Sequence, residues 1–166
     1  QLLNTAKRTG SKLSIIESGR KINENMPQHV IELTTDAFSE CNISLEKSEI
    51  LILGISYKPN VKDVQLSPAE EIIKKLQKLG ANIHIYDPYF FSNEVFGIKV
   101  EDNLQEILPK MNAAIIVTGH DDFKKIQISS FTNMKNSILI DTRGIIEPHL
   151  IKQHNIIFRG LGRGGF

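Results

Sequence analysis

Apolar residues follow a helical pattern in the first quarter of the chain. Between residues 14 and 41 they recur every three or four positions and so share one helix face, namely Ile22, Met26, Val30, Leu33 and Ala37. Ser14 and Glu17 have the spacing of a capping box, which predicts that the helix starts there. Pro27 lacks a backbone N–H group, so we expect it to kink this helix or to begin a second one.

A different pattern begins near residue 48. Residues 49–54 form a nearly continuous apolar run, which is typical of a strand covered on both faces. Ser67, Pro68 and Glu70 mark the start of a helix, and Gly80 marks its end. Further strands are expected at 81–86, 98–100, 113–118, 137–141 and 156–159, with further helices at 104–108, 122–126 and 148–154.

Strands that alternate with helices indicate βαβ crossovers and therefore a parallel sheet. We expect a doubly wound, mainly parallel, Rossmann-like α/β domain at 48–166, preceded by a helical segment at 1–47. The apolar stripe of this segment has no core of its own. It must pack on the domain or on another domain or subunit, and the pattern alone leaves these alternatives open.

Composition narrows the classes of partner. Among 166 residues, 20 basic side chains oppose 19 acidic ones, and the net charge of +1 gives no reason to expect nucleic acid or a membrane surface as partner. No apolar run reaches the length of about 18 residues that a membrane span needs. Cys41 is the single cysteine, which excludes an internal disulfide and favours a reducing compartment, so we expect a cytoplasmic protein.

Two cationic residues follow predicted strands. Tyr57 and Lys58 come after the first strand, and Arg143 comes after the strand at 137–141. Ligands of doubly wound sheets bind beyond the carboxyl ends of the strands. Lysine offers a point charge and arginine a two-pronged grip on phosphate, so the pair suggests an anionic, phosphorylated ligand. The alternative is that each cation pairs with a nearby acid, Asp63 or Asp141.

The glycine-rich fingerprint of dinucleotide sites is absent after the first strand. Gly54 is followed by Ile-Ser-Tyr-Lys rather than by G-x-G-x-x-G. Asp87 ends the second strand where a ribose-binding acid would stand, but Asp87-Pro88 is interpreted as a turn. We therefore do not expect this domain to be the primary NAD site.

Other candidates favour structural roles. The histidines do not form a cluster with metal-ligand spacing. His120 lies at a strand end, where a loop-capping role is favoured over a ligand contact. Cys41 has no base nearby in the sequence, so a nucleophilic role is not expected. The glycine-rich stretch 160–165 could wrap a phosphate, but a flexible tail is favoured.

Residues 57–68, YKPNVKDVQLSP, resemble the aromatic-Lys-Pro-Asn-x-x-Asp-x-Arg-x-Ser-Pro motif that opens the C-terminal, UDP-sugar-binding domain of the UDP-glucose/GDP-mannose dehydrogenase family. The likeness continues through 86–88, 118–123 and 141–144. Upstream, 6–7, 18–23 and 26–27 resemble the helical segment that pairs subunits in this family. Segments 118–123 and 159–163 look most like the UDP-N-acetyl-D-mannosamine dehydrogenase branch.

The resemblance implies an NAD-dependent oxidation of a UDP-sugar C6 alcohol to a carboxylate, in two steps through a cysteine-bound intermediate, as in polysaccharide biosynthesis. It implies that Tyr57, Lys58 and Arg143 contact the UDP-sugar substrate and that the helical segment forms a homodimer. Gln65 stands where the family has an arginine that reaches toward the cofactor. Gln65 is therefore the position expected to face NAD, without the positive charge that the arginine supplies in the family.

The resemblance also implies missing parts. The family's NAD domain and catalytic cysteine precede the segment that Gln1 begins, and the chain starts without methionine. We expect a C-terminal fragment that is inactive alone, with NAD bound mainly by the missing N-terminal domain. The alternatives are a stand-alone nucleotide-binding or regulatory α/β module and a purely structural module whose helices mediate dimerisation.

Overall fold

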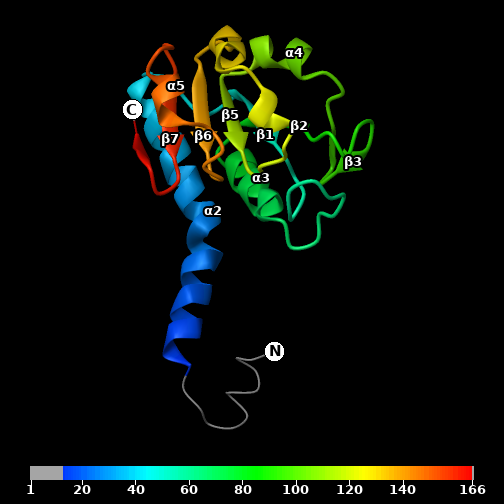
Figure 1. The fold of residues 1–166 in the computed structure, drawn as a ribbon, viewed down its shortest axis with the longest axis vertical. Helices are drawn as coiled ribbons and strands as arrows, with labels where there is room; N and C mark the ends of the chain where they lie inside the picture. Colours follow the sequence, from blue (N-terminus) through cyan, green and yellow to red (C-terminus); the bar gives the residue numbers. More distant parts are fainter. Residues whose placement is uncertain (1–12, 166) are drawn as a thin grey trace.

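The computed structural model describes residues 13–165, and a six-stranded sheet forms their centre (Figure 1). The strands are β1 Glu49–Leu53, β2 Asn82–Tyr86, β5 Ala113–Ile116, β6 Ile138–Asp141, β7 Ile157–Gly160 and β8 Gly164–Gly165. Their order is β2-β1-β5-β6-β7-β8. All neighbours are parallel except β7 and β8. The chain winds outward from β1 to β2 and then to the other side through β5, so the predicted doubly wound α/β fold is confirmed.

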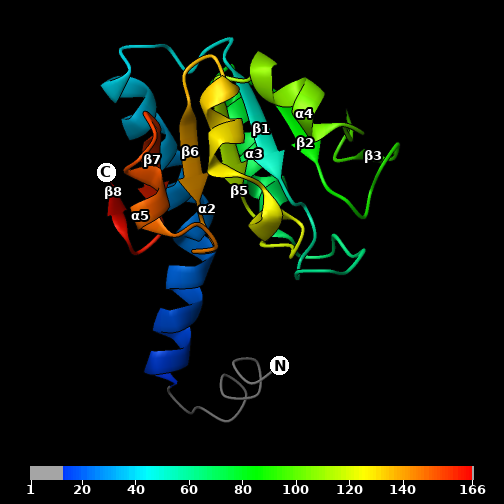
Figure 2. The same cartoon turned by 45° about the horizontal axis from the view of Figure 1, so that its top comes forward.

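Helices cover both faces of this sheet (Figure 2). One face carries α2 Ser14–Glu40 and α3 Pro68–Lys78. The other carries α4 Leu104–Ile107, α5 Pro148–Ile151 and the 3-10 helices η1 Leu108–Lys110, η2 Phe123–Lys125 and η3 Ile128–Asn133. Side chains alternate along β1, so Ile50 and Ile52 join the core under α3 while Leu51 and Leu53 join the opposite one. Both faces of the strand are buried, which explains its continuous apolar run.

Local sequence signals place α3 as predicted. The Ser67 hydroxyl accepts a hydrogen bond from the Ala69 N–H group at 3.2 Å, and Pro68 occupies the first turn. Gly80 follows the helix with a φ of +86°, a conformation that glycine adopts without steric cost. A short antiparallel pair, β3 Glu94–Val95 and β4 Ile98–Lys99, lies beyond β2.

Helix α2 is continuous through Pro27, and only part of it is buried. The predicted capping box is wrong, because the helix follows Leu13 without any side-chain cap. From Val30 onward the helix packs on the sheet, whereas Ile15 is 89% and Ile22 61% exposed. Its N-terminal half projects from the α/β body (Figure 1). The remainder of the predicted 1–47 segment, residues 1–12, lies outside the described residues.

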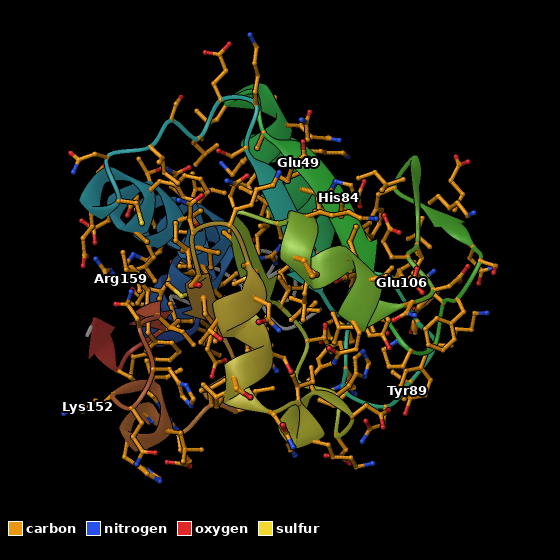
Figure 3. All side chains as sticks on the ribbon, turned by 90° about the horizontal axis from the view of Figure 1, so that it is seen from above. Glu49, His84, Tyr89, Glu106, Lys152 and Arg159 are labelled. Atoms are coloured by element: carbon orange, nitrogen blue, oxygen red, sulfur yellow. The ribbon has the colours of Figure 1, made fainter. Side chains whose placement is uncertain are left out.

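Arg159 connects the packed half of α2 to β7 (Figure 3). Its guanidinium donates to the Asp36 carboxylate at 2.8 Å and to the Glu40 carboxylate at 2.5 Å. The arginine itself is 9% exposed. This contact holds the helix at the outer part of the sheet.

The glycine-rich C-terminal stretch is not a flexible tail as predicted. It turns back through the Arg163 N–H bond to the Gly160 carbonyl and pairs β8 with β7. No helix within residues 13–165 is long and apolar enough to cross a membrane.

Candidate functional site

A pocket of about 590 Å³ opens beyond the carboxyl ends of the strands, where the N-terminal half of α2 leaves the domain. The residues that line it include Ser56, Tyr57 and Lys58 after β1, Val117 after β5, and Thr142 and Arg143 after β6. The structure therefore brings Tyr57, Lys58 and Arg143 together, as their positions at strand ends predicted. Asn23, Met26 and Pro27 of α2 complete one wall.

The two cations of this pocket keep their charges available. Among residues 13–165, neither the Lys58 ammonium nor the Arg143 guanidinium forms an ion pair. The Lys58 ammonium lies 5.6 Å from the centre of the Tyr57 ring, a cation–π contact. The alternative in which the cations pair with Asp63 and Asp141 is therefore wrong.

The Asp141 carboxylate instead organises the turn after β6. It is fully buried and accepts backbone N–H bonds from Arg143, Gly144 and Ile146, each at 2.8 Å. A carboxylate that receives several N–H groups is well solvated by the protein itself. The turn that carries Arg143 is thus fixed through its backbone, and the guanidinium is not needed for this purpose.

Asp87 has a similar role at the end of β2. Its side chain is 0% exposed and accepts bonds from the Ile55 N–H at 2.8 Å and the Tyr89 N–H at 2.9 Å. The His120 ring lies 3.1 Å from the same carboxylate. Burial alone would raise the pKa of Asp87, but the bonds from His120, Ile55 and Tyr89 outweigh it and lower that pKa. The interpretation of Asp87 as a turn residue is confirmed.

His120 caps a loop, as predicted. It is fully buried after β5, and its Nδ1 accepts the Asn60 N–H at 2.9 Å. The ring packs against Tyr89, with 4.9 Å between ring centres, and against the edge of Phe123 at 5.3 Å. It does not line the pocket.

Gly54 has a steric role at the end of β1. A Cβ atom there would lie 2.7 Å from both the backbone oxygen and the Cβ of Thr118, and the φ of Gly54 is +82°. The glycine allows the chains after β1 and β5 to approach, and the Thr118 hydroxyl donates to the Ser56 carbonyl at 2.5 Å. This space is filled by protein, so these residues do not fit the pyrophosphate of NAD.

Neither Gln65 nor Cys41 lines the pocket. Gln65 is exposed and outside the lining, and its N–H group donates to the Asp63 carboxylate at 2.9 Å. Burial and the neighbouring Glu40 raise the pKa of the Cys41 thiol, which makes it a poorer nucleophile. Within residues 13–165 no group of His, Cys, Asp and Glu side chains could hold a metal ion.

A polar cluster that the sequence did not predict lies on β1 and β2, where Figure 3 labels Glu49 and His84. His84 lies between the Glu49 carboxylate at 2.7 Å and the Glu101 carboxylate at 3.0 Å. Burial would raise the pKa of Glu49, but bonds from His84 and Asn82 lower it. The cluster joins β1, β2 and the segment that follows β4, and none of its residues lines the pocket.

Fold and pocket together define a doubly wound α/β domain with a lysine, an arginine and a tyrosine in a pocket at the carboxyl edge of its sheet. Residues 51–148 match the family model described as "UDP-glucose/GDP-mannose dehydrogenase family, UDP binding domain". The chain belongs to the UDP-glucose/GDP-mannose dehydrogenase family, which confirms the resemblance seen in its motifs.

Individual relatives cover nearly all of this chain. It is 31% identical over 164 residues to the UDP-N-acetyl-D-mannosamine dehydrogenase of Pyrococcus horikoshii. The aligned residues make up 98% of this chain and 36% of the relative. The solved structure of that organism's UDP-D-ManNAc dehydrogenase superposes with a TM-score of 0.83 at 29% identity, covering 96% of this chain and 36% of the other. The UDP-glucose 6-dehydrogenase TuaD of Bacillus subtilis is 28% identical over 98% of this chain and 35% of its own length. The chain thus spans about a third of the length of these curated relatives.

Proposed function

We propose that this chain is the nucleotide-sugar-binding part of an NAD-dependent UDP-sugar 6-dehydrogenase, and that its pocket binds the UDP group. The observation that carries the proposal is that Lys58 and Arg143, at the carboxyl edge of the sheet, form no ion pair within residues 13–165. The pocket volume of about 590 Å³ suits a small-molecule ligand. Membership of the family and the similarity to UDP-sugar dehydrogenases support UDP over other phosphorylated ligands.

Each of the three predicted residues has a chemical role in this proposal. Lys58 supplies a point charge to the diphosphate, and Arg143 can donate two parallel hydrogen bonds to it. Tyr57 is 48% exposed, so its ring can contact the nucleotide or the sugar. Because no acid among the described residues pairs with either cation, both charges are available to the ligand.

The oxidation itself would need groups beyond the described residues. Conversion of a primary alcohol to a carboxylate transfers two hydrides to two NAD⁺, and water supplies the second carboxylate oxygen. The described residues offer no pyrophosphate cradle after β1, and the raised pKa of Cys41 argues against it as the nucleophile. The chain alone would therefore bind the UDP-sugar substrate without oxidising it, and Gln65 would face a cofactor held elsewhere.

The sugar is proposed to be N-acetyl-D-mannosamine, with glucose as the second candidate. Several of the most similar curated relatives are UDP-N-acetyl-D-mannosamine dehydrogenases, and UDP-glucose 6-dehydrogenases also match. We further propose that the protein forms a homodimer through α2, because the outer half of that helix exposes isoleucines. The free thiol of Cys41 supports a cytoplasmic location.

The test is a calorimetric titration of the chain with UDP. We expect saturable binding that weakens by about ten- to a hundred-fold in Lys58→Ala and in Arg143→Ala, because each loses a charge-assisted contact. Lys110→Ala, an exposed lysine outside the pocket, is the matched control and should bind UDP as the unaltered chain does. Absence of binding at millimolar UDP would contradict the proposal and favour a purely structural module.

A further inference from the structure

The loop that carries Lys58 has no regular secondary structure between β1 and α3, so other contacts must fix its shape. One contact closes the loop at its base, where the Tyr57 N–H donates to the Asp63 carbonyl at 2.7 Å. A second group of contacts holds Asn60, two residues after Lys58. The turn of Lys58 therefore lies between two anchored points.

Asn60 is held from both its backbone and its side chain. Its N–H group donates to His120 Nδ1 at 2.9 Å. Its side-chain amide donates to the Asp121 carboxylate at 2.7 Å and accepts the Asp121 N–H at 3.0 Å. With a φ of +61°, Asn60 adopts a left-handed conformation that these contacts must stabilise.

The contact to His120 depends on which ring nitrogen carries the proton. The Asn60 amide can only donate, so Nδ1 must accept, and the neutral ring then carries its proton on Nε2. The buried Asp87 carboxylate, 3.1 Å from Nε2, accepts a hydrogen bond from the Nε2–H group and so selects this tautomer. The rings of Tyr89 and Phe123 hold the imidazole in place.

We infer that His120 is a positioning residue for nucleotide binding, acting through Asn60 on the turn that presents Lys58. The inference rests on the proposed function of the pocket. The hydrogen bonds from Asp87 through His120 to Asn60 tie the loop after β1 to the ends of β2 and β5. The Lys58 ammonium is thereby presented in one geometry, and less ordering is needed when the ligand binds.

Two substitutions separate the two bonds of His120. In His120→Asn, the side-chain oxygen can take the place of Nδ1 and accept from Asn60, but nothing reaches Asp87. In His120→Gln, the longer amide can donate to Asp87, but no acceptor remains at the Nδ1 position. Each variant thus keeps one of the two hydrogen bonds and loses the other. Both variants place a neutral amide at the same buried position, so they differ mainly in which bond is lost.

The experiment measures UDP affinity by calorimetry and the hydrogen-exchange rate of the Asn60 amide by NMR, together with thermal stability. We expect His120→Gln to bind UDP about three- to ten-fold more weakly than the unaltered chain and to exchange the Asn60 amide faster. His120→Asn should retain affinity within about two-fold and keep the amide protected. Asn112→Ala, which removes contacts to Glu49 and Asn136 at the far edge of the sheet, should lower stability without changing UDP affinity.

The outcomes distinguish this inference from the proposed function. If the unaltered chain does not bind UDP, the proposed function fails and the inference fails with it. If the chain binds UDP but the two His120 variants bind it equally, or if affinity follows stability in all variants including Asn112→Ala, His120 is only structural and the inference is overturned.

Discussion

At the scale of single residues, the buried Asp87 carboxylate shows how a charge is accommodated without water. An isolated carboxylate in the protein interior would be strongly unfavourable. Two backbone N–H groups and the His120 ring instead surround Asp87, and these bonds lower its pKa despite its burial. Its charge is thereby part of the folded structure, and the stability of the domain depends on that charge.

The lowered pKa gives a pH dependence of known sign. Because Asp87 binds its proton more weakly when folded than when unfolded, its contribution is present above its ordinary pKa of 3.8 and is lost as the pH falls through the lower folded value. At pH 7 we expect Asp87→Asn to unfold about 1–3 kcal/mol more easily than the unaltered chain. Urea unfolding between pH 7 and pH 3 should show this difference shrinking below about pH 4.

A matched substitution checks the assignment to Asp87. Among residues 13–165, the exposed Asp102 accepts only the N–H and hydroxyl groups of Ser92, and Asp102→Asn should keep the pH dependence of the unaltered chain. A difference between the unaltered chain and Asp87→Asn that stays constant down to pH 3 would contradict the proposed role of the charge.

Sequence alone could predict that the cations lie in the pocket, but not that residues of α2 also line it. Lys58 and Arg143 follow strands, and in a parallel sheet the strand ends share one edge. Asn23 and Met26 reach the same pocket from α2, more than thirty residues earlier in the chain than Lys58. Which part of a helix crosses the sheet edge is decided by tertiary packing, and no local pattern contains that information.

At the scale of elements, the packing of α2 on β7 combines apolar burial with the Arg159 contacts. The carboxylates of Asp36 and Glu40 are largely exposed, so they would return to water if the arginine were removed. We expect Arg159→Leu to lower the free energy of unfolding by about 1–2 kcal/mol, because two charge-assisted bonds to a buried guanidinium are lost. Chemical denaturation measures the loss.

A control substitution for the Arg159→Leu variant is available on α2, the helix that carries Asp36 and Glu40. Arg20 and Glu24 form an exposed pair at 2.6 Å, and Arg20→Gln should cost at most about 0.5 kcal/mol. If Arg159→Leu costs no more than Arg20→Gln, the contact between α2 and β7 depends on apolar packing alone.

Elements with strong local signals were predictable, and the others were not. β1 has a continuous apolar run, and α3 has Ser67, Pro68 and Gly80 as boundary residues. β8 consists of two glycines, whose pairing with β7 depends on backbone groups that carry no side-chain pattern. The 3-10 helix η3 at Ile128–Asn133 was missed because its short turns lack the periodicity of an α-helix.

At the scale of the whole molecule, the outer half of α2 is a helical segment that the domain leaves uncovered. Ile15 and Ile22 are seven residues apart, so they lie on one face of the helix, and both are exposed. In the proposed homodimer this face is buried. We expect Ile15→Glu and Ile22→Glu each to shift the chain toward monomer in sedimentation velocity, since each places a charge in an apolar interface.

Lys21→Glu introduces the same side chain on a different face of the helix and should leave assembly unchanged. A monomer at every concentration of the unaltered chain, or equal assembly in the isoleucine variants, would contradict dimerisation through α2.

Pro27 lies where α2 passes from its covered half to its exposed half, and it also lines the pocket. One continuous helix therefore takes part in two separate binding steps, the proposed association of subunits and the proposed binding of nucleotide. If association changes the angle of the helix at Pro27, the free energies of the two events are linked, and each must alter the other by the same factor. Affinity for the nucleotide would then vary with protein concentration, so dilution of the protein would itself regulate binding.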